Sequence, residues 1–299
     1  MKRILLCLLV TSCGTEKTRN TPPSTNDTML AMRQEYLNQM SKVQDADGFT
    51  DTHKCDALLH TALLGVGGAT IHNINAARNA DGQWFRRPLS YRECLSVGES
   101  RSTLSRDMVV GLIWYWYTTK DVASAEAFYQ YTTDRFLKFG ESDGTIEGNS
   151  RIFITPGLLA LLAEVIFRAG GPNHALARSA QAIREAPEVT GFEAHLQTLT
   201  TILWGKLTGF QSPFEVTSIA FNVNRRPDNA MFQYAAGNKD AVARLLVSHH
   251  PQERLPNTAD YCNPLRYETE TNAPCPNADG SGTDIAPTHF MFLSKLIAE

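Results

Sequence analysis

The sequence predicts an all-α fold, and three observations support that prediction. Apolar residues recur at helical spacing through most of the chain beyond residue 28. Proline and glycine stand where helices should begin and end, and alternating runs long enough for core strands are absent. Some segments are apolar on nearly every face, which is typical of helices enclosed by other helices; between Leu158 and Phe167 only Glu164 is polar. We therefore expect an (α/α) toroid of helical hairpins, about six of them, either compact or incomplete.

The expected helices follow one another through short connections. Thr155-Pro156 predicts a start, because threonine caps a helix and proline fits its first turn. Gly170-Gly171-Pro172 predicts the matching end. The expected helices cover residues 29–43, 56–66, 69–80, 104–118, 121–139, 156–169, 173–186, 192–207, 213–223, 228–236, 239–249 and 285–298.

The N-terminus predicts an export signal. Lys2-Arg3 is followed by an apolar run from Ile4 to Val10, which is far shorter than the ~20 residues of a membrane-spanning helix. Residues 10–13, Val-Thr-Ser-Cys, resemble the lipobox of bacterial lipoproteins. The resemblance implies cleavage before Cys13 and attachment of a diacylglyceryl group to its thiol. The alternatives are an ordinary cleaved signal peptide with an incidental cysteine, or an N-terminus that is apolar by chance. We expect a signal peptide at 1–12, a lipidated cysteine and polar tether at 13–27, and one domain at 28–299.

Composition excludes one class of partner. The formal charge is −3, and removal of residues 1–12 leaves 26 basic against 31 acidic residues. Such a mixed, mildly acidic chain has no basic patch for nucleic acid.

Four cysteines remain after Cys7 is removed and Cys13 is acylated. An even number in an exported protein favours disulfides, and their spacing favours Cys55–Cys94 with Cys262–Cys275. The alternatives are free buried thiols, or a zinc site that uses Cys55 with His53 and His60. The paired Cys-x-x-Cys spacing of structural zinc sites is absent from the sequence.

Asp-Gly turns recur ahead of expected helices, at residues 45–51, 141–147 and 277–284. The first, Asp45-x-Asp47-Gly-x-x-Asp51, partly resembles a calcium-binding loop, but it lacks a third acid before the glycine and a bidentate glutamate. A solvated turn is the alternative, and we expect no other cofactor. Repeated turns of this kind would place several acids on one rim of the helical array.

Carboxylates near expected helix starts are the candidate catalytic groups. Asp56, Asp107 and Glu147 are the main ones, and Asp51 and Asp284 have similar positions. Glycoside hydrolysis needs one protonated and one ionised carboxyl group, and neighbouring helix starts can supply both. The alternative is structural, because acids also interact favourably with the helix dipole at these positions.

A loop with Trp84, Arg86 and Arg87, followed by Arg106, is the candidate substrate-binding surface. Aromatic faces stack on sugars, and guanidinium groups bind carboxylate or phosphate. His53 is a further candidate, as a proton shuttle. The alternative is a tryptophan packed beneath the loop, with the arginines in salt bridges.

The order of these loops and helices resembles six-hairpin glycosidases and polysaccharide lyases, in which inner-helix N-termini line a glycan-cleaving cleft. The resemblance covers most of residues 28–299 and is one of rhythm and loop chemistry. It implies a membrane-anchored enzyme that acts on cell-wall or extracellular polysaccharide, either a hydrolase or a lyase. An aspartate directly after the lipidated cysteine resembles the inner-membrane retention signal of some bacteria with two membranes. Gly14 stands at that position here, which favours the outer membrane. The competing interpretation is a non-catalytic surface lipoprotein that binds glycan or protein, since the same fold also hosts non-enzymes.

Overall fold

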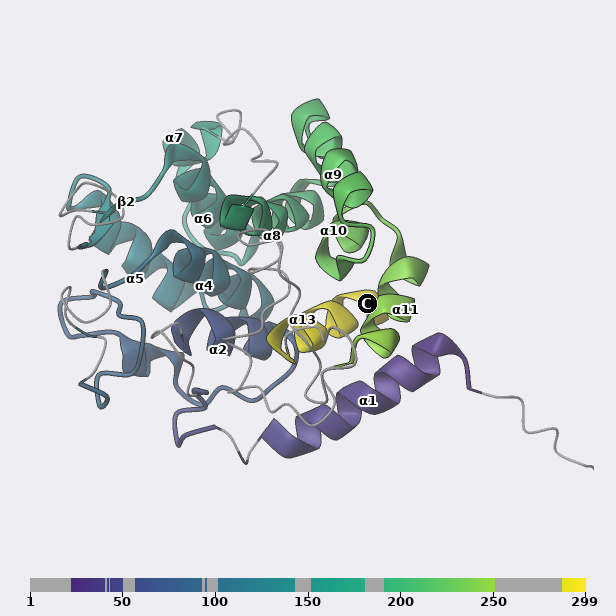
Figure 1. The fold of residues 1–299 in the computed structure, drawn as a ribbon. Helices are drawn as coiled ribbons and strands as arrows, with labels where there is room; N and C mark the ends of the chain where they lie inside the picture. Colours follow the sequence, from purple (N-terminus) through teal and green to yellow (C-terminus); the bar gives the residue numbers. More distant parts are fainter. Residues whose placement is uncertain are drawn as a thin grey trace, which may run out of the picture.

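The computed structural model describes residues 23–40, 42, 44–50, 57–92, 95, 102–142, 152–180, 191–250 and 287–299, and it is predominantly helical (Figure 1). The all-α prediction is therefore confirmed. The α-helices of these residues are α1 (Thr25–Met40), α2 (Ala57–Val66), α4 (Arg106–Thr119), α5 (Val122–Thr133), α6 (Pro156–Arg168), α7 (Ala175–Ser179), α8 (Gly191–Thr208), α9 (Pro213–Arg225), α10 (Ala230–Ala235), α11 (Lys239–Ser248) and α13 (Pro287–Ala298).

The predicted punctuation of α6 is confirmed at both ends. Thr155 Oγ1 accepts a hydrogen bond from Leu158 N at 3.3 Å, and Pro156 begins the helix. At the other end Gly170 has a φ of +93°, and Gly171 N donates to Ile166 O at 2.9 Å. A left-handed residue with a backward hydrogen bond of this kind satisfies the last free carbonyls of a helix.

Two of the predicted helices are longer than the helices that form. Residues 69–80 contain only a short 3₁₀ helix, η2 (Ile74–Ala77), because His72 N and Asn73 N donate to Asp47 O instead of continuing a helix. The helix expected over 121–139 ends at Thr133, and Phe136 and Leu137 have positive φ values of 55° and 70°. After this reversal β1 (Lys138–Gly140) pairs antiparallel with β2 (Ile152–Phe153). Two strands this short were below what the sequence pattern detects.

Six helices contact one another in a closed series. Helix α2 packs on α4, α4 on α6, α6 on α8, α8 on α10, α10 on α13, and α13 on α2. The remaining longer helices each pack against members of this series: α1 on α13, α5 on α4 and α6, α9 on α8 and α10, and α11 on α10 and α13. The first and last helices of the described chain are therefore neighbours (Figure 1).

The interior of this series is filled by large side chains. Trp114 of α4 is fully buried, donates its indole N–H to Leu199 O of α8 at 3.0 Å, and packs edge-on against Phe292 of α13 at 5.0 Å. One continuous apolar cluster extends from Met29 to Leu296. These contacts make the middle of the closed series part of the hydrophobic core.

Helices α2 and α4 run in the same direction. A β-carbon at Gly111 would lie 2.9 Å from Leu59 Cδ1, and one at Gly65 would lie 2.8 Å from Tyr115 Cε2. A later residue of α2 therefore contacts a later residue of α4, which means that the helices are parallel. Their N-terminal ends lie at the same end of the pair. Within the described ranges, no helix is both long and apolar enough to cross a membrane.

Candidate functional site

Asp107 is a buried carboxylate at the N-terminal end of α4. It is the second residue of the helix, after Arg106, and only 6% of its surface is exposed. Ser105 Oγ donates a hydrogen bond to Asp107 Oδ1. No cationic side chain pairs with Asp107 in the part of the chain that the structure describes. The helix N-terminus and one hydroxyl therefore provide the local stabilisation of its charge.

Arg86 connects the starts of α2 and α4. Its carbonyl oxygen accepts from Leu58 N at 2.8 Å, in the first turn of α2. Its Nε donates to Ser102 O at 2.7 Å and its Nη2 to Ser102 Oγ, just ahead of α4. The guanidinium is buried, so Arg86 fixes the two helix starts relative to each other.

His60 and Thr288 connect α2 to α13. His60 Nδ1 lies 3.1 Å from Thr288 Oγ1, and both residues are buried. The next residue of α13, His289, is also buried. Three members of the helical series, α2, α4 and α13, therefore carry buried polar groups in their first turns, where the core gives way to the connecting segments.

The expected sugar platform at Trp84 is wrong, because the indole has no exposed surface. Trp84 packs edge-on against Trp116 at 5.8 Å, with the guanidinium of Arg78 5.8 Å from its ring. Arg87 is also buried, and its guanidinium lies 4.6 Å from the ring centre of Tyr91. The burial of Trp84 agrees with the alternative of a tryptophan packed beneath the loop, while the printed contacts of Arg86 and Arg87 are with Ser102 and Tyr91. Of the predicted binding arginines, Arg106 alone is partly exposed among the described ones.

The first Asp-Gly turn is held by its own side chains. Asp45 Oδ1 accepts from Asp47 N and Phe49 N, both at 2.9 Å, and Asp47 Oδ1 accepts from Asn73 Nδ2 at 3.1 Å. Within the described ranges no group of three His, Cys, Asp or Glu side chains is placed to hold a metal ion. The third residue of the proposed calcium set, Asp51, lies outside those ranges.

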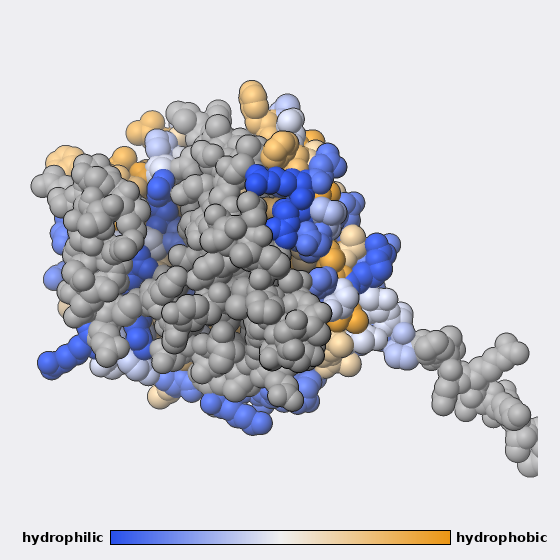
Figure 2. Space-filling model, viewed as in Figure 1, coloured by the Kyte–Doolittle hydropathy of each residue, from blue (hydrophilic) through white to orange (hydrophobic). Residues whose placement is uncertain are grey.

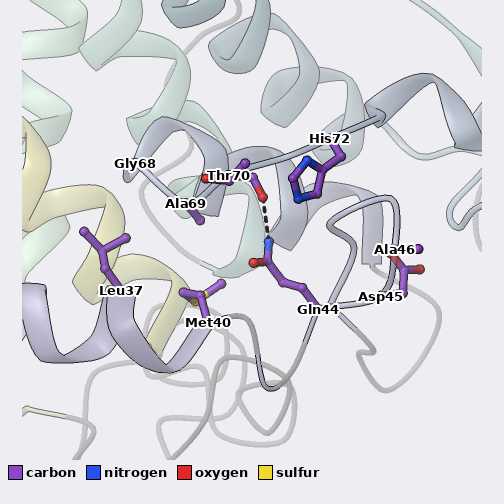
Figure 3. Close-up of a pocket in the computed structure, with 9 residues that line it drawn as sticks. All are labelled: Leu37, Met40, Gln44, Asp45, Ala46, Gly68, Ala69, Thr70 and His72. Carbon is purple, nitrogen blue, oxygen red and sulfur yellow. Dashed lines mark hydrogen bonds between the residues drawn. The ribbon is translucent and has the colours of Figure 1, made fainter.

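A pocket of about 440 Å³ lies beside this turn, and sequence reasoning missed it (Figure 3). Gln44 crosses it and donates from Nε2 to Thr70 O at 3.0 Å and to Gly48 O at 2.7 Å. Leu37 and Met40 of α1 and the segment after α2 form the walls. The pocket is therefore at the C-terminal end of α2, away from Asp107. The recurrent Asp-Gly turn was the one signal that pointed to this region. The lining residues are Leu37, Met40, Gln44, Asp45, Ala46, Gly68, Ala69, Thr70 and His72.

Glu164 is the second buried carboxylate of interest, and it is fully paired. Arg168 Nε lies 2.7 Å from one of its oxygens and Arg178 Nε 2.6 Å from the other. Burial raises the pKa of Glu164, but the hydrogen bonds and charges of the two arginines outweigh burial and hold that pKa below its ordinary value.

Several predicted residues lie outside the described residues, so their positions stay predictions. They are Cys13, Asp51, His53, Cys55, Asp56, Cys94, Glu147, Cys262, Cys275 and Asp284.

Comparison with known proteins adds no family assignment: no protein family, curated protein or solved structure matches the chain.

Proposed function

We propose that the chain is a lipid-anchored exported protein that cleaves a polysaccharide, with Asp107 as one of its two catalytic carboxyl groups. The observation that carries this proposal is the burial of Asp107 at a helix start without a cationic partner among the described residues. A structural acid is usually paired when it is buried, as Glu164 is. A buried carboxyl group that is not engaged in an ion pair is a candidate for acid–base chemistry.

The proposed architecture is a six-hairpin (α/α) toroid. The closed series α2, α4, α6, α8, α10 and α13 supports it as the inner ring, with α1, α5, α7, α9 and α11 outside. The shared direction of α2 and α4 supports a common rim for their N-termini. In this proposal η2 occupies the outer position between α2 and α4, which makes the toroid compact at that point.

The proposed reaction uses Asp107 with a second carboxyl group, Asp56 or Glu147. In hydrolysis one carboxylic acid protonates the glycosidic oxygen as the bond to the anomeric carbon breaks. The other carboxylate removes a proton from the attacking water, or attacks the carbon itself. A lyase would instead remove the proton from the carbon beside a uronic carboxylate, with His53 as the candidate base and Arg106 near the substrate acid. The electron pair forms a carbon–carbon double bond as the neighbouring bond to the glycosidic oxygen breaks, and the leaving oxygen takes up a proton.

The second candidate is a non-catalytic surface lipoprotein that binds glycan or protein. The pocket beside the first Asp-Gly turn favours it, since the side chains of Gln44, Thr70 and His72 line a hollow distant from Asp107. In this case Asp107 stabilises α4 and takes no part in chemistry.

The test is a screen of wall, capsule and extracellular polysaccharides for new reducing ends, with the absorbance of unsaturated products followed in parallel. Asp107→Asn keeps the shape and a hydrogen-bond acceptor but cannot exchange a proton, so we expect activity to fall at least about 100-fold. Asp121→Asn is the matched control, because Asp121 caps α5 through Ser124 N at 3.1 Å and should leave activity unchanged. Equal activity of the parent and Asp107→Asn would remove Asp107 from the mechanism. Tight binding of one glycan without cleavage would favour the second candidate.

The anchor is tested separately by Cys13→Ala. We expect the variant to accumulate as unprocessed or soluble protein, while the parent fractionates with the outer membrane in a cell that has two membranes. Unchanged fractionation and mobility would exclude the lipoprotein assignment. Non-reducing mass spectrometry tests the proposed bridges Cys55–Cys94 and Cys262–Cys275, and four free thiols would exclude both.

A further inference from the structure

The turn beside the pocket is built on the side chain of Asp45. Its Oδ1 accepts from the backbone N–H groups of Asp47 and Phe49, both at 2.9 Å. The backbone closes the same turn, because Asp45 N donates to Phe49 O at 2.9 Å and Gly48 N donates to Asp45 O at 3.0 Å. Gly48 has a φ of +91°, which glycine adopts without strain. One oxygen of the Asp45 carboxylate is therefore used to hold the turn.

A second turn, which begins at Asn79, has the same structure without a charge at its first position. Asn79 Oδ1 accepts from Asp81 N at 3.1 Å and from Gln83 N at 2.9 Å, and Gly82 has a φ of +89°. Asn79 N donates to Gln83 O at 2.9 Å, and Gly82 N donates to Asn79 O at 3.1 Å. An amide oxygen at the first position is therefore sufficient for this turn. The geometry of the turn does not account for the negative charge of Asp45.

Asp45 differs from Asn79 in its surroundings, because it lines the pocket of about 440 Å³ and Asn79 is not among the lining residues. Asp45 Oδ2 accepts no hydrogen bond from the residues that the structure describes. The neighbouring Gln44 donates from Nε2 to two carbonyl oxygens, which fixes the orientation of its amide. Gln44 Oε1 is left as a second acceptor with no donor among the described residues. The polar side of the pocket therefore offers one carboxylate oxygen and one amide oxygen.

The other side of the pocket is apolar. Leu37 and Met40 of α1 form it together with Ala69. Figure 3 shows Leu37 and Met40 on one side of Gln44 and Asp45 on the other. Cavities of about 300–1,000 Å³ are typical of small-molecule sites, so this pocket has room for a small ring or a short chain. A ligand that fits both sides has a cationic donor at one end and apolar surface at the other.

The charge of the lining has one sign. Asp45 is the one acidic residue of the lining, and the described lining contains neither lysine nor arginine. The guanidinium of Arg33 is engaged at the end of α2, where its Nη2 donates to Gly67 O. The carboxylate of Asp47 accepts from Asn73 Nδ2 at 3.1 Å. The lining therefore favours a cation over an anion.

The pocket opens among exposed residues. Ala46, Thr70 and His72 line it and are exposed. Figure 2 shows mainly hydrophilic side chains along the lower edge of the molecule, where α1 lies in Figure 1. A water-soluble ligand therefore reaches the pocket from solvent.

We propose that this pocket binds a protonated primary amine on a small, partly apolar body, such as an amino sugar. The ammonium group pairs with Asp45 Oδ2, Gln44 Oε1 accepts a further hydrogen bond, and the apolar part packs on Leu37 and Met40. The pocket is at the C-terminal end of α2, away from Asp107, so this inference does not rest on the cleavage reaction. It deepens the second candidate function by naming the class of ligand.

The experiment titrates the full chain by calorimetry at a slightly acidic pH, where the amines are protonated. The probes are glucosamine and n-butylamine, which separate a sugar source of the amine from an aliphatic one. N-acetylglucosamine is the matched neutral probe, because it keeps the sugar ring and carries no cationic amine. We expect at least one amine to bind about tenfold more tightly than N-acetylglucosamine, since a hydrogen bond to a charged group contributes roughly that factor.

Two reciprocal variants test the role of Asp45. Asp45→Asn removes the charge and keeps the oxygen that holds the turn. We expect it to fold with an unchanged melting temperature, as the turn at Asn79 does, and to bind the amine about tenfold more weakly. Asn79→Asp is the control, because it adds a charge to a turn of the same structure whose first residue does not line the pocket. It should bind the amine with the affinity and stoichiometry of the parent.

Each outcome decides the proposal. Amine binding that is weakened in Asp45→Asn and unchanged in Asn79→Asp supports it, whichever amine binds. Absence of binding of both amines, equal affinity for N-acetylglucosamine, or unchanged affinity in Asp45→Asn overturns it. Unfolding of Asp45→Asn also overturns it, because the turn would then require the charge. A second amine site in Asn79→Asp would show that the turn binds the amine without the pocket. The cleavage reaction is judged separately through Asp107→Asn.

Discussion

Two buried carboxylates lie in very different surroundings. Glu164 in α6 has an arginine on each oxygen, and its pKa lies below the ordinary value. Asp107 in α4 is as well buried but has Ser105 and a helix terminus in place of a cation. The difference teaches that burial alone does not assign a role to an acid. The ion pair between Glu164 and Arg178 links α6 to α7, whereas Asp107 has no such link to a neighbouring helix among the described residues.

The largest effect on stability is expected for Glu164→Gln. The change removes the negative charge that pairs with Arg168 and Arg178, and it leaves the guanidinium of Arg178 without an ion pair to residue 164. Loss of one member of a buried pair usually costs about 3–5 kcal/mol, and the half-exposed position of Arg168 reduces this to about 2 kcal/mol. Urea unfolding of the two proteins measures the difference. The neighbouring change Arg168→Gln is the control and should cost less, about 1 kcal/mol or below. Equal stability of the parent and Glu164→Gln would show that the ion pairs of Glu164 do not stabilise the fold.

The next effect is that the difference in unfolding free energy between the parent and Glu164→Gln depends on pH. The pKa of Glu164 is lowered in the folded state, so its contribution is fully present above the unfolded value near 4.5. The contribution is lost as the pH falls through the folded value. We therefore expect the stability difference between parent and Glu164→Gln to be constant near neutral pH and to shrink below about pH 4.5. Chemical unfolding at a series of pH values measures it, and a difference that grows on acidification would contradict the assignment.

The smallest effect is expected for Asp107→Asn on stability. The asparagine keeps an acceptor for Ser105 and removes a buried charge, so the loss of interaction with the helix dipole and the relief of desolvation oppose each other. We expect the free energy of unfolding to change by about 0.5 kcal/mol or less. A loss as large as that of Glu164→Gln would show that the two carboxylates are alike and that Asp107 is structural.

The sequence predicted the helices well where local chemistry decides the structure. Thr155 and Pro156 start α6, and Gly170 ends it, because capping and positive φ are properties of single residues. Prediction failed at residues 69–80, where contacts with the distant residue Asp47 replace helical hydrogen bonds. The prediction that Trp84 binds sugar was wrong for a similar reason. Its partner Trp116 is distant in the chain, and no local pattern shows that the two rings pack together.

The candidate site was predicted only at the level of residue type and helix position. That Asp107 begins a helix follows from the sequence, but its burial without a cation depends on how α4 lies among its neighbours. The pocket beside Asp45 depends on three separate segments, which no single stretch of sequence contains.

The closed series of helices also has a consequence for the order of folding. Its last contact joins α13 to α2, two helices separated by more than two hundred residues. His60 of α2 is buried in the finished protein next to Thr288 of α13, so part of its cover is synthesised last. Long-range closure of this kind slows folding, because the entropy of a long loop is lost before the contact stabilises the chain. Under the proposed export this delay favours translocation, because the contact between α13 and α2 cannot form until the final helix is available.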